Sequence, residues 1–173
     1  GGGGGGGGRG GGRGGEGGGG GGVEKLNKKM DVGEVVTAVK FLEKHNIKSR
    51  AFILLKPPFM NEQEGVFWAK KSIDKAFDAG VDCCTVIPVR PGNGAMDQLM
   101  KNGDFEKPAL KSLEEVLDYG VSLNRGRVFA DTWDLEQFSD CDLCLKQRIS
   151  RIEEINLHQI LNQNIRCTCK VDA

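Results

Sequence analysis

The sequence predicts an α/β fold in which strands and helices alternate along the chain. Three short segments, 50–58, 82–89 and 127–131, are almost continuously apolar, as is typical of strands buried on both faces of a parallel sheet. Amphipathic helical patterns precede the first segment and separate the three from one another. Because helix and strand alternate, we expect parallel βαβ units, arranged as a sheet or as part of a barrel.

The helices are placed by their capping signals and apolar periodicity. A helix over 31–46 would begin at Asp31, which is a good N-cap residue. The next helix would begin with a capping box formed by Asn61 and Glu64. Pro108 suits the first turn of a later helix. The side chains expected to face inward from the second helix are those of Val66, Phe67, Ala69, Ile73, Ala76 and Phe77.

The amino-terminal 1–22 are glycine except for Arg9, Arg13 and Glu16. Glycine can neither bury a side chain nor hold regular structure against its own backbone entropy. The tract is therefore either a flexible tail or a run of placeholders for unassigned residues, which could include a further strand. A glycine-arginine tail that binds RNA is less well supported, because the tract holds two arginines and no aromatic residue.

Charge and hydropathy exclude several classes of protein. Lysine plus arginine and aspartate plus glutamate are equal at 24 each, so no overall field draws the chain to nucleic acid or to an anionic membrane. No apolar run reaches the roughly 18 residues of a membrane span, and no secretion signal is recognisable. We expect a cytoplasmic protein without a membrane partner, in which cysteines serve as thiols or metal ligands rather than as disulfides.

Polar residues follow the predicted strands at their carboxyl ends. Because the carboxyl ends of parallel strands meet at one edge of a sheet or barrel, these side chains are expected to converge on one pocket. Loops are also polar simply because they are solvated, so each residue alone is a weak signal. The residues concerned are Lys56, Arg90, Asn93, Asp131, Thr132 and Trp133.

Four cysteines have spacings that suit a metal site. Cys141 and Cys144 form a C-x-x-C pair, and Cys167 and Cys169 form a C-x-C pair. Four thiolates suit a structural zinc ion and also an auxiliary iron-sulfur cluster, with unliganded thiols as the remaining alternative. A helix over about 145–161 fits between the pairs and could bring them together.

The other two cysteines and the basic residues of the carboxyl-terminal helix have simpler interpretations. Cys83 and Cys84 lie in a predicted strand and face opposite sides, so we expect small core residues rather than ligands of one metal. Lys146, Arg148 and Arg151 are close together on the helix. They could contact RNA phosphates, or they could belong to an ordinary solvated face.

Longer stretches of the sequence resemble a known family. The stretches are EKLNKKM, SRAFILLKPPFMNEQEG, VIPVRPGNGAMDQL, GRVFADTWDLEQFSDCDLC and INLHQ. Together, from about residue 23 to 169, they resemble the second half of a radical S-adenosylmethionine enzyme, in the branch that includes the β subunit of archaeosine synthase and its bacterial relatives. The resemblance implies a partial, TIM-like (β/α)₆ barrel whose strands four to six are the three predicted above.

The resemblance divides the chain into three parts. The tract 1–22 would contain the third barrel strand, ending at Glu16, which precedes Glu24 at the spacing that the family pattern requires. Half of the barrel would occupy 23–133. A carboxyl-terminal helix with the C-x-x-C and C-x-C clasp would occupy 134–173.

The implied activity is radical chemistry. In the family, a C-x-x-x-C-x-x-C motif holds a [4Fe-4S] cluster that reductively cleaves S-adenosylmethionine to a 5′-deoxyadenosyl radical, which removes a hydrogen atom from the substrate. The motif is absent from these 173 residues. The resemblance therefore implies a fragment that is inactive alone, or a degenerate relative. The archaeosine branch modifies a lysine-bearing deazaguanine in tRNA, so tRNA and a partner enzyme subunit are implied partners.

The resemblance also implies residues that bind S-adenosylmethionine. Glu16 would bind the amino or ribose hydroxyl groups, Lys56 the methionine carboxylate, and Arg90 that carboxylate or a substrate phosphate. Asp131 and Trp133 would reach the adenine or the substrate. In the alternative interpretations, Lys56 pairs with a neighbouring carboxylate, Arg90 clamps its loop and Trp133 is core. The alternative function is a non-catalytic zinc module, clasped by cysteines, that binds nucleic acid or takes part in assembly.

Overall fold

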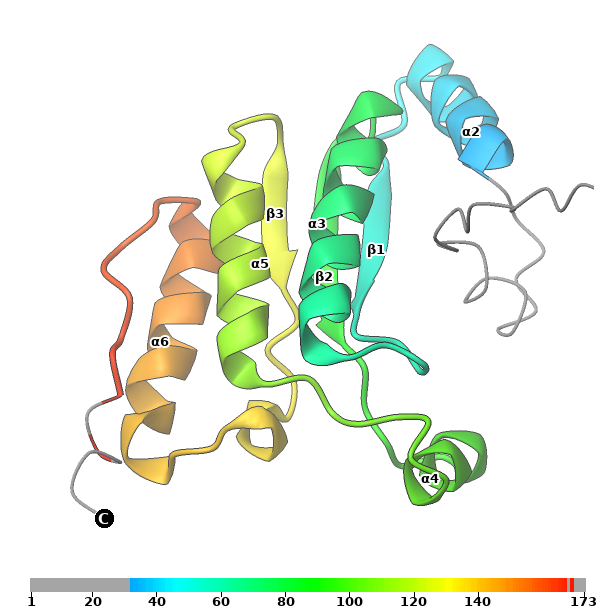
Figure 1. Cartoon of the computed structure of the whole chain (residues 1–173). Coiled ribbons are helices and arrows are strands. Elements are labelled where there is room, and N and C mark those ends of the chain that lie inside the picture. The colour runs from blue at the N-terminus through cyan, green and yellow to red at the C-terminus, as the bar shows by residue number, and fades with distance from the viewer. Residues whose placement is uncertain (1–31, 168, 170–173) are drawn as a thin grey trace, which may run out of the picture.

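The computed structural model describes residues 32–167 and 169, and it contains the predicted alternation of helix and strand (Figure 1). Glu16, the strand expected to end there, and Asp31 lie outside the described residues. The elements in chain order are α2 (Val32–Lys44), β1 (Arg50–Leu55), α3 (Glu62–Asp78), β2 (Cys83–Pro88), α4 (Gly94–Lys101), α5 (Leu110–Ser122), β3 (Arg127–Ala130), the 3₁₀ turn η1 (Leu135–Phe138) and α6 (Asp142–His158).

The three strands form one parallel sheet, in the order β1-β2-β3. The register places Arg50 of β1 opposite Cys83 of β2, and Cys83 opposite Arg127 of β3. The helices that connect the strands, α3 and α5, lie on the same face of the sheet (Figure 1). The predicted α/β class and parallel βαβ units are therefore confirmed, and the described part of the sheet is open rather than closed into a barrel.

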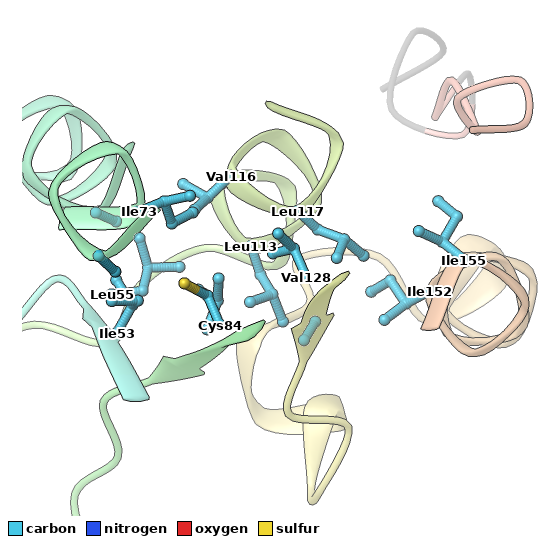
Figure 2. Packing of buried hydrophobic residues seen from close by; sticks show 14 of the residues in the cluster. Ile53, Leu55, Ile73, Cys84, Leu113, Val116, Leu117, Val128, Ile152 and Ile155 are labelled. Atoms are coloured by element: carbon cyan, nitrogen blue, oxygen red, sulfur yellow. The ribbon is translucent and has the colours of Figure 1, made fainter. Parts of the chain in front are cut away.

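The core lies between this face of the sheet and the helices. Alternate strand residues such as Leu55, Cys84 and Val128 are fully buried there, as the strand period of two requires. Side chains from α3 and α5 fill the same layer, as Figure 2 shows for Ile73 and Leu117. Each large apolar side chain buried in this way contributes about 1.5–3 kcal/mol to stability relative to an exposed one.

The opposite face of the sheet is apolar but largely uncovered. We call it the open face and define it by Phe52, Leu54, Ile87 and Phe129, which alternate with the core residues along the strands. Phe52 is 64 % exposed and Leu54 is 38 % exposed. Parallel sheets are ordinarily covered on both faces. Among the described residues, therefore, the sheet has only one of its two expected covers.

The two edges of the sheet differ. Val128 and Ala130 point their peptide groups away from β2, and two side-chain amides of the α6 region bind them. Gln159 accepts from the Val128 N–H at 2.7 Å and donates to its carbonyl at 2.9 Å. Asn156 does the same for Ala130, at 2.8 Å in both directions. These amides substitute for a further strand, so the β3 edge is closed, and no described strand pairs with the outer edge of β1.

The helix signals are confirmed in part. Asn61 and Glu64 form the predicted capping box, each side chain bonded to the other residue's backbone N–H at 2.9 Å. Phe67 was expected to face inward and is 52 % exposed, which corrects that expectation. The buried stripe of α3 runs through Gly65, Ala69 and Ile73 at four-residue spacing, and this places position 67 on the outer side.

The start predicted for the helix at Pro108 is also corrected. Pro108 lies just before α5 rather than in its first turn, and the N-cap is Ala109. The Ala109 N–H donates to the Glu62 carboxylate at 2.9 Å. Because α3 supplies this carboxylate, a tertiary contact fixes the start of α5.

We expect Asn156→Leu to lower the free energy of unfolding by about 1–3 kcal/mol, because the peptide groups of Ala130 would lose their partners at a partly buried edge. Gln147→Leu, on the exposed side of the same helix, is the matched control and should change stability by less than about 0.5 kcal/mol. Urea denaturation of both variants measures the difference. Equal effects would show that the amide does not close the β3 edge.

Candidate metal centre

The structure brings together the four cysteines of the C-x-x-C and C-x-C pairs. The sulfurs of Cys141, Cys144, Cys167 and Cys169 all lie within 4.8 Å of one another, and those of Cys144 and Cys169 are 3.5 Å apart. The first pair is buried and the second is exposed. Such a group could hold a metal ion. We call these residues the cysteine centre.

The path that brings the pairs together differs from the expected one. A helix over 145–161 was expected to join them, but the observed helix begins and ends three residues earlier, at Asp142 and His158. A helix of 17 residues is about 25 Å long, so it separates its ends. The chain reverses at Gln159, which has a left-handed φ of 56°, and then runs back along α6 (Figure 1). This return segment, 159–167, carries the second pair to the start of the helix.

Arg151 holds the return segment in place. Its guanidinium donates to the carbonyls of Asn162 at 3.1 Å and Gln163 at 3.2 Å. The same group binds both oxygens of Asp118 on α5 at 2.9 Å. The Arg151 side chain is buried, so one cation connects α5, α6 and the return segment where little water screens it.

Arg148 anchors the other end of α6. It binds the Glu114 carboxylate on α5 at 2.5 and 3.0 Å, and both residues are buried. Arg148 also lies one turn after Cys144, on the same face of the helix. The interpretation of Lys146, Arg148 and Arg151 as an RNA-binding group is therefore wrong for the two arginines, because α5 carboxylates neutralise them inside the protein. Only Lys146 is exposed.

The environment differentiates the thiols within the cysteine centre. The pKa of Cys141 is lowered to about 7, chiefly by the backbone N–H of Cys144 and then by the Cys167 thiol. Cys141 is the N-cap of α6, where the helix dipole also favours the thiolate form. The pKa of Cys144 is raised to about 12, chiefly by its hydrogen bond with Cys169 and then by burial.

A second cluster lies where β2 and β3 end. Arg90 binds the Asp131 carboxylate at 2.8 Å and donates to the carbonyl of Trp133. Its guanidinium carbon lies 5.1 Å from the Trp133 ring and 5.3 Å from the Phe138 ring, as in cation–π contacts. We call these four residues the Arg90 cluster. Trp133 is 70 % exposed, so it is not a core residue.

Three of the residues nominated at the strand ends thus meet, and Lys56 does not join them. Lys56 is 3 % exposed, and its ammonium binds Glu62 at 2.8 Å, the Lys107 carbonyl at 3.3 Å and Glu106 at 3.5 Å. This is the pairing with a neighbouring carboxylate that the sequence left open. Phe138 was not nominated, and its only signal was that it shares with Trp133 and Leu135 an apolar character in a linker rich in acidic residues.

The remaining candidates are structural. The Asn93 side chain accepts from the Met96 N–H at 2.9 Å and caps α4. Cys83 and Cys84 face opposite sides of the sheet as predicted, and burial raises the pKa of the Cys84 thiol to about 12. A thiol with that pKa stays protonated and inert at neutral pH.

Comparison with known proteins does not assign the chain to a family. No family model and no solved structure matches the chain. It is 25 % identical over 154 residues to an uncharacterized protein of Methanocaldococcus jannaschii, a match that covers 84 % of this chain and 42 % of that protein. The chain therefore spans about two fifths of the length of this curated relative. Within the described residues, the helices are too short or too polar to cross a membrane.

The surroundings of Lys56 generate a prediction about Gly65. A side chain at position 65 would place its Cβ 2.7 Å from the Lys56 Cβ and 2.9 Å from its Cα, closer than atoms can pack. We expect Gly65→Ala to lower the free energy of unfolding by about 1–3 kcal/mol. Gly94→Ala, at the start of α4 with nothing within 4 Å of the new atom, is the control and should be near neutral. Thermal unfolding of both variants tests the contact, and an equal shift in Tm would contradict it.

Proposed function

We propose that the cysteine centre binds a single zinc ion that fastens the return segment to the start of α6. The distances between the sulfurs carry this proposal. Two thiolates bound to one zinc ion at about 2.3 Å lie about 3.8 Å apart in a tetrahedron and at most about 4.6 Å apart. The widest spacing allowed by the observed limit of 4.8 Å is about 1 Å more than the tetrahedral distance, so each sulfur would move by about half an ångström, which side-chain rotation supplies.

A four-iron cluster fits the same residues less well. In such a cluster each thiolate binds a different iron, so iron and sulfide atoms stand between the cysteine sulfurs and push them apart. The cysteine centre is too compact for that without movement of the backbone that carries the exposed pair. The arrangement of Cys141 at the amino end of α6 also favours bound thiolates, because the helix dipole stabilises negative charge there.

We expect the purified chain to bind one equivalent of zinc, and Co²⁺ in its place to give the strong visible bands of a tetrahedral thiolate site. Cys167→Ser and Cys169→Ser together should abolish stoichiometric binding. Cys83→Ser, which removes a thiol outside the cysteine centre, is the control and should leave binding unchanged. Metal analysis and titration with Co²⁺ measure both results. An iron-sulfur spectrum after anaerobic isolation would contradict a zinc site.

We further propose that this chain is the second half of a radical S-adenosylmethionine enzyme. Three features of the sheet support the proposal. The strands are parallel and sequential with helices on one face, which is the arrangement of half a (β/α) barrel. The β3 edge is closed by amides, whereas β1 can still accept a neighbour. The open face is largely apolar, and its β1 residues Phe52 and Leu54 are exposed. A preceding set of strands would add at β1 and cover that face.

The amide closure gives a physical role to one of the resembling segments. Asn156 and Gln159 belong to INLHQ, and both bind the outer edge of β3. A barrel that ends after its sixth strand needs such a closure, because the edge of the last strand would otherwise be free to pair with another chain. The relative in Methanocaldococcus jannaschii is also more than twice as long as its match, so it contains further chain outside the matched part.

The residues at the carboxyl edge would take different parts in binding S-adenosylmethionine. That cofactor supplies, on one-electron reduction, the 5′-deoxyadenosyl radical that removes hydrogen from substrate. Trp133 offers an exposed ring on which a base could stack. The cations of Lys56 and Arg90 already have carboxylate partners, so they fit less well as direct ligands. In our proposal they position the loops, and Glu16 and the cluster ligands complete the site from outside the described residues.

The substrate and partners are proposed by resemblance alone. A tRNA substrate and a partner subunit agree with the archaeosine branch. The alternative is a non-catalytic zinc module that binds nucleic acid or takes part in assembly, and one observation favours it: all four ligands of the cysteine centre lie in this chain. A fold and a cofactor do not fix a substrate.

A longer polypeptide that continues this chain toward its amino terminus should contain C-x-x-x-C-x-x-C. After anaerobic reconstitution with iron and sulfide, and with a one-electron reductant, we expect it to cleave S-adenosylmethionine to methionine and 5′-deoxyadenosine. The present chain alone should be inactive, because it lacks that motif. Liquid chromatography of the products measures both. A longer polypeptide without the motif, or a reconstituted cluster without cleavage, would favour the zinc module.

A further inference from the structure

We infer that metal at the cysteine centre sets the position of the Arg90 cluster at the carboxyl edge of the sheet. The inference rests on the proposed zinc site and assigns a structural role to the metal. The observation behind the inference is that Phe138 packs against Arg90 and that Cys141, the first proposed metal ligand, follows Phe138 by three residues.

The segment 131–141 has little regular structure of its own. It leaves β3, contains only the short turn η1, and reaches α6 at Cys141. Its first residue, Asp131, is held by the sheet, because its N–H donates to the Val86 carbonyl at 2.9 Å. Asp134 then adopts a left-handed conformation with φ 50°, which a non-glycine residue holds only when its surroundings enforce it.

The middle of this segment is anchored by packing. Leu135 is fully buried and Phe138 is 5 % exposed. Phe138 and Trp133 both contact the Arg90 guanidinium, whose Nε is buried and has no hydrogen-bond partner. Arg90 therefore depends on these two rings for its position as well as on Asp131. If Phe138 moves, the support of Arg90 on one side is lost.

The end of the segment is connected tightly to the cysteine centre. The Ser139 hydroxyl accepts from the Cys141 N–H at 3.2 Å and donates to its carbonyl at 3.0 Å, which makes a stiff turn between Phe138 and the ligand. Cys144 is fixed independently, because Arg148 one turn later is paired with Glu114 on α5. A metal that joins Cys141 to Cys144 thus holds the segment 131–141 against an element that is already immobile.

Outside helix α6 itself, the hydrogen bonds described for the Cys141 backbone are those with the Ser139 hydroxyl. Without metal, the far end of the segment is held by the packing of Leu135 and Phe138, by the Ser139 turn, and by a long ion pair of 3.9 Å between the exposed Asp140 carboxylate and Arg148. The cysteine centre therefore stabilises the position of Trp133 from a distance, through the segment that joins them. Trp133 has an exposed ring at the carboxyl edge. Its metal would order the edge without touching whatever binds there.

Hydrogen exchange, read by mass spectrometry on the full chain with and without zinc, tests this support. On removal of zinc with a chelator under reducing conditions, amides within 131–140 should exchange at least about tenfold faster, as expected for a segment that opens locally. Amides of β1 and β2 should keep their protection, because the core of the sheet does not depend on the metal. The Cys167→Ser and Cys169→Ser double variant should reproduce the metal-free result in the presence of zinc, although both substitutions are exposed and lie far along the chain from Phe138.

A second readout follows the ring itself. With 5-fluorotryptophan in the chain, and Trp133→Phe to assign the two signals, the fluorine resonance of Trp133 should shift on zinc removal while that of Trp68 on α3 stays unchanged. If zinc binds and neither the exchange of 131–140 nor the Trp133 resonance changes on its removal, the support is disproved and the zinc site stands. If the chain does not bind zinc, both proposals fail.

Discussion

The buried ion pairs between α5 and α6 are the constraint on which the carboxyl-terminal half of the structure depends. Arg148 with Glu114 and Arg151 with Asp118 fix α6 against a helix that is itself packed on the sheet. Removing one partner of such a pair leaves an uncompensated buried charge, which costs far more than an exposed pair contributes. Because α6 is fixed, Asn156 meets the β3 edge and Cys144 stays at a defined place.

Arg151 links this constraint to the chemistry of the cysteines. It binds carbonyls of the return segment, so the same cation that docks α6 also directs the exposed cysteine pair toward the buried one. The metal proposed there then closes a loop that hydrogen bonds have already shaped. Such preorganisation would reduce the chain entropy lost when the proposed metal binds.

In the described part of the chain, one face and one edge of the sheet lack the partners that such surfaces ordinarily have. Among the described residues, helices cover one face of the sheet and amides close the β3 edge, whereas the open face is largely uncovered and the β1 edge has no strand partner. The β1 edge is on the amino-terminal side of the strand order, and the most exposed residues of the open face, Phe52 and Leu54, also belong to β1. The Arg90 cluster stands at the carboxyl edge, where ligands of parallel α/β folds bind. These features support the proposed half-barrel to which earlier strands would add, and the zinc module remains the alternative proposal.

The sequence by itself determined the local features: the alternation of helix and strand, the capping box at Asn61, the opposite facing of Cys83 and Cys84, and the two cysteine pairs. Each depends on periodicity or on spacing within a few residues, which a sequence displays directly. Tertiary structure alone decided that Lys56 pairs with Glu62, that two arginines of α6 are buried, and that the chain reverses at Gln159 to assemble the cysteine centre. Those outcomes depend on partners many residues away, and a one-dimensional pattern of charge does not record which partner a cation meets.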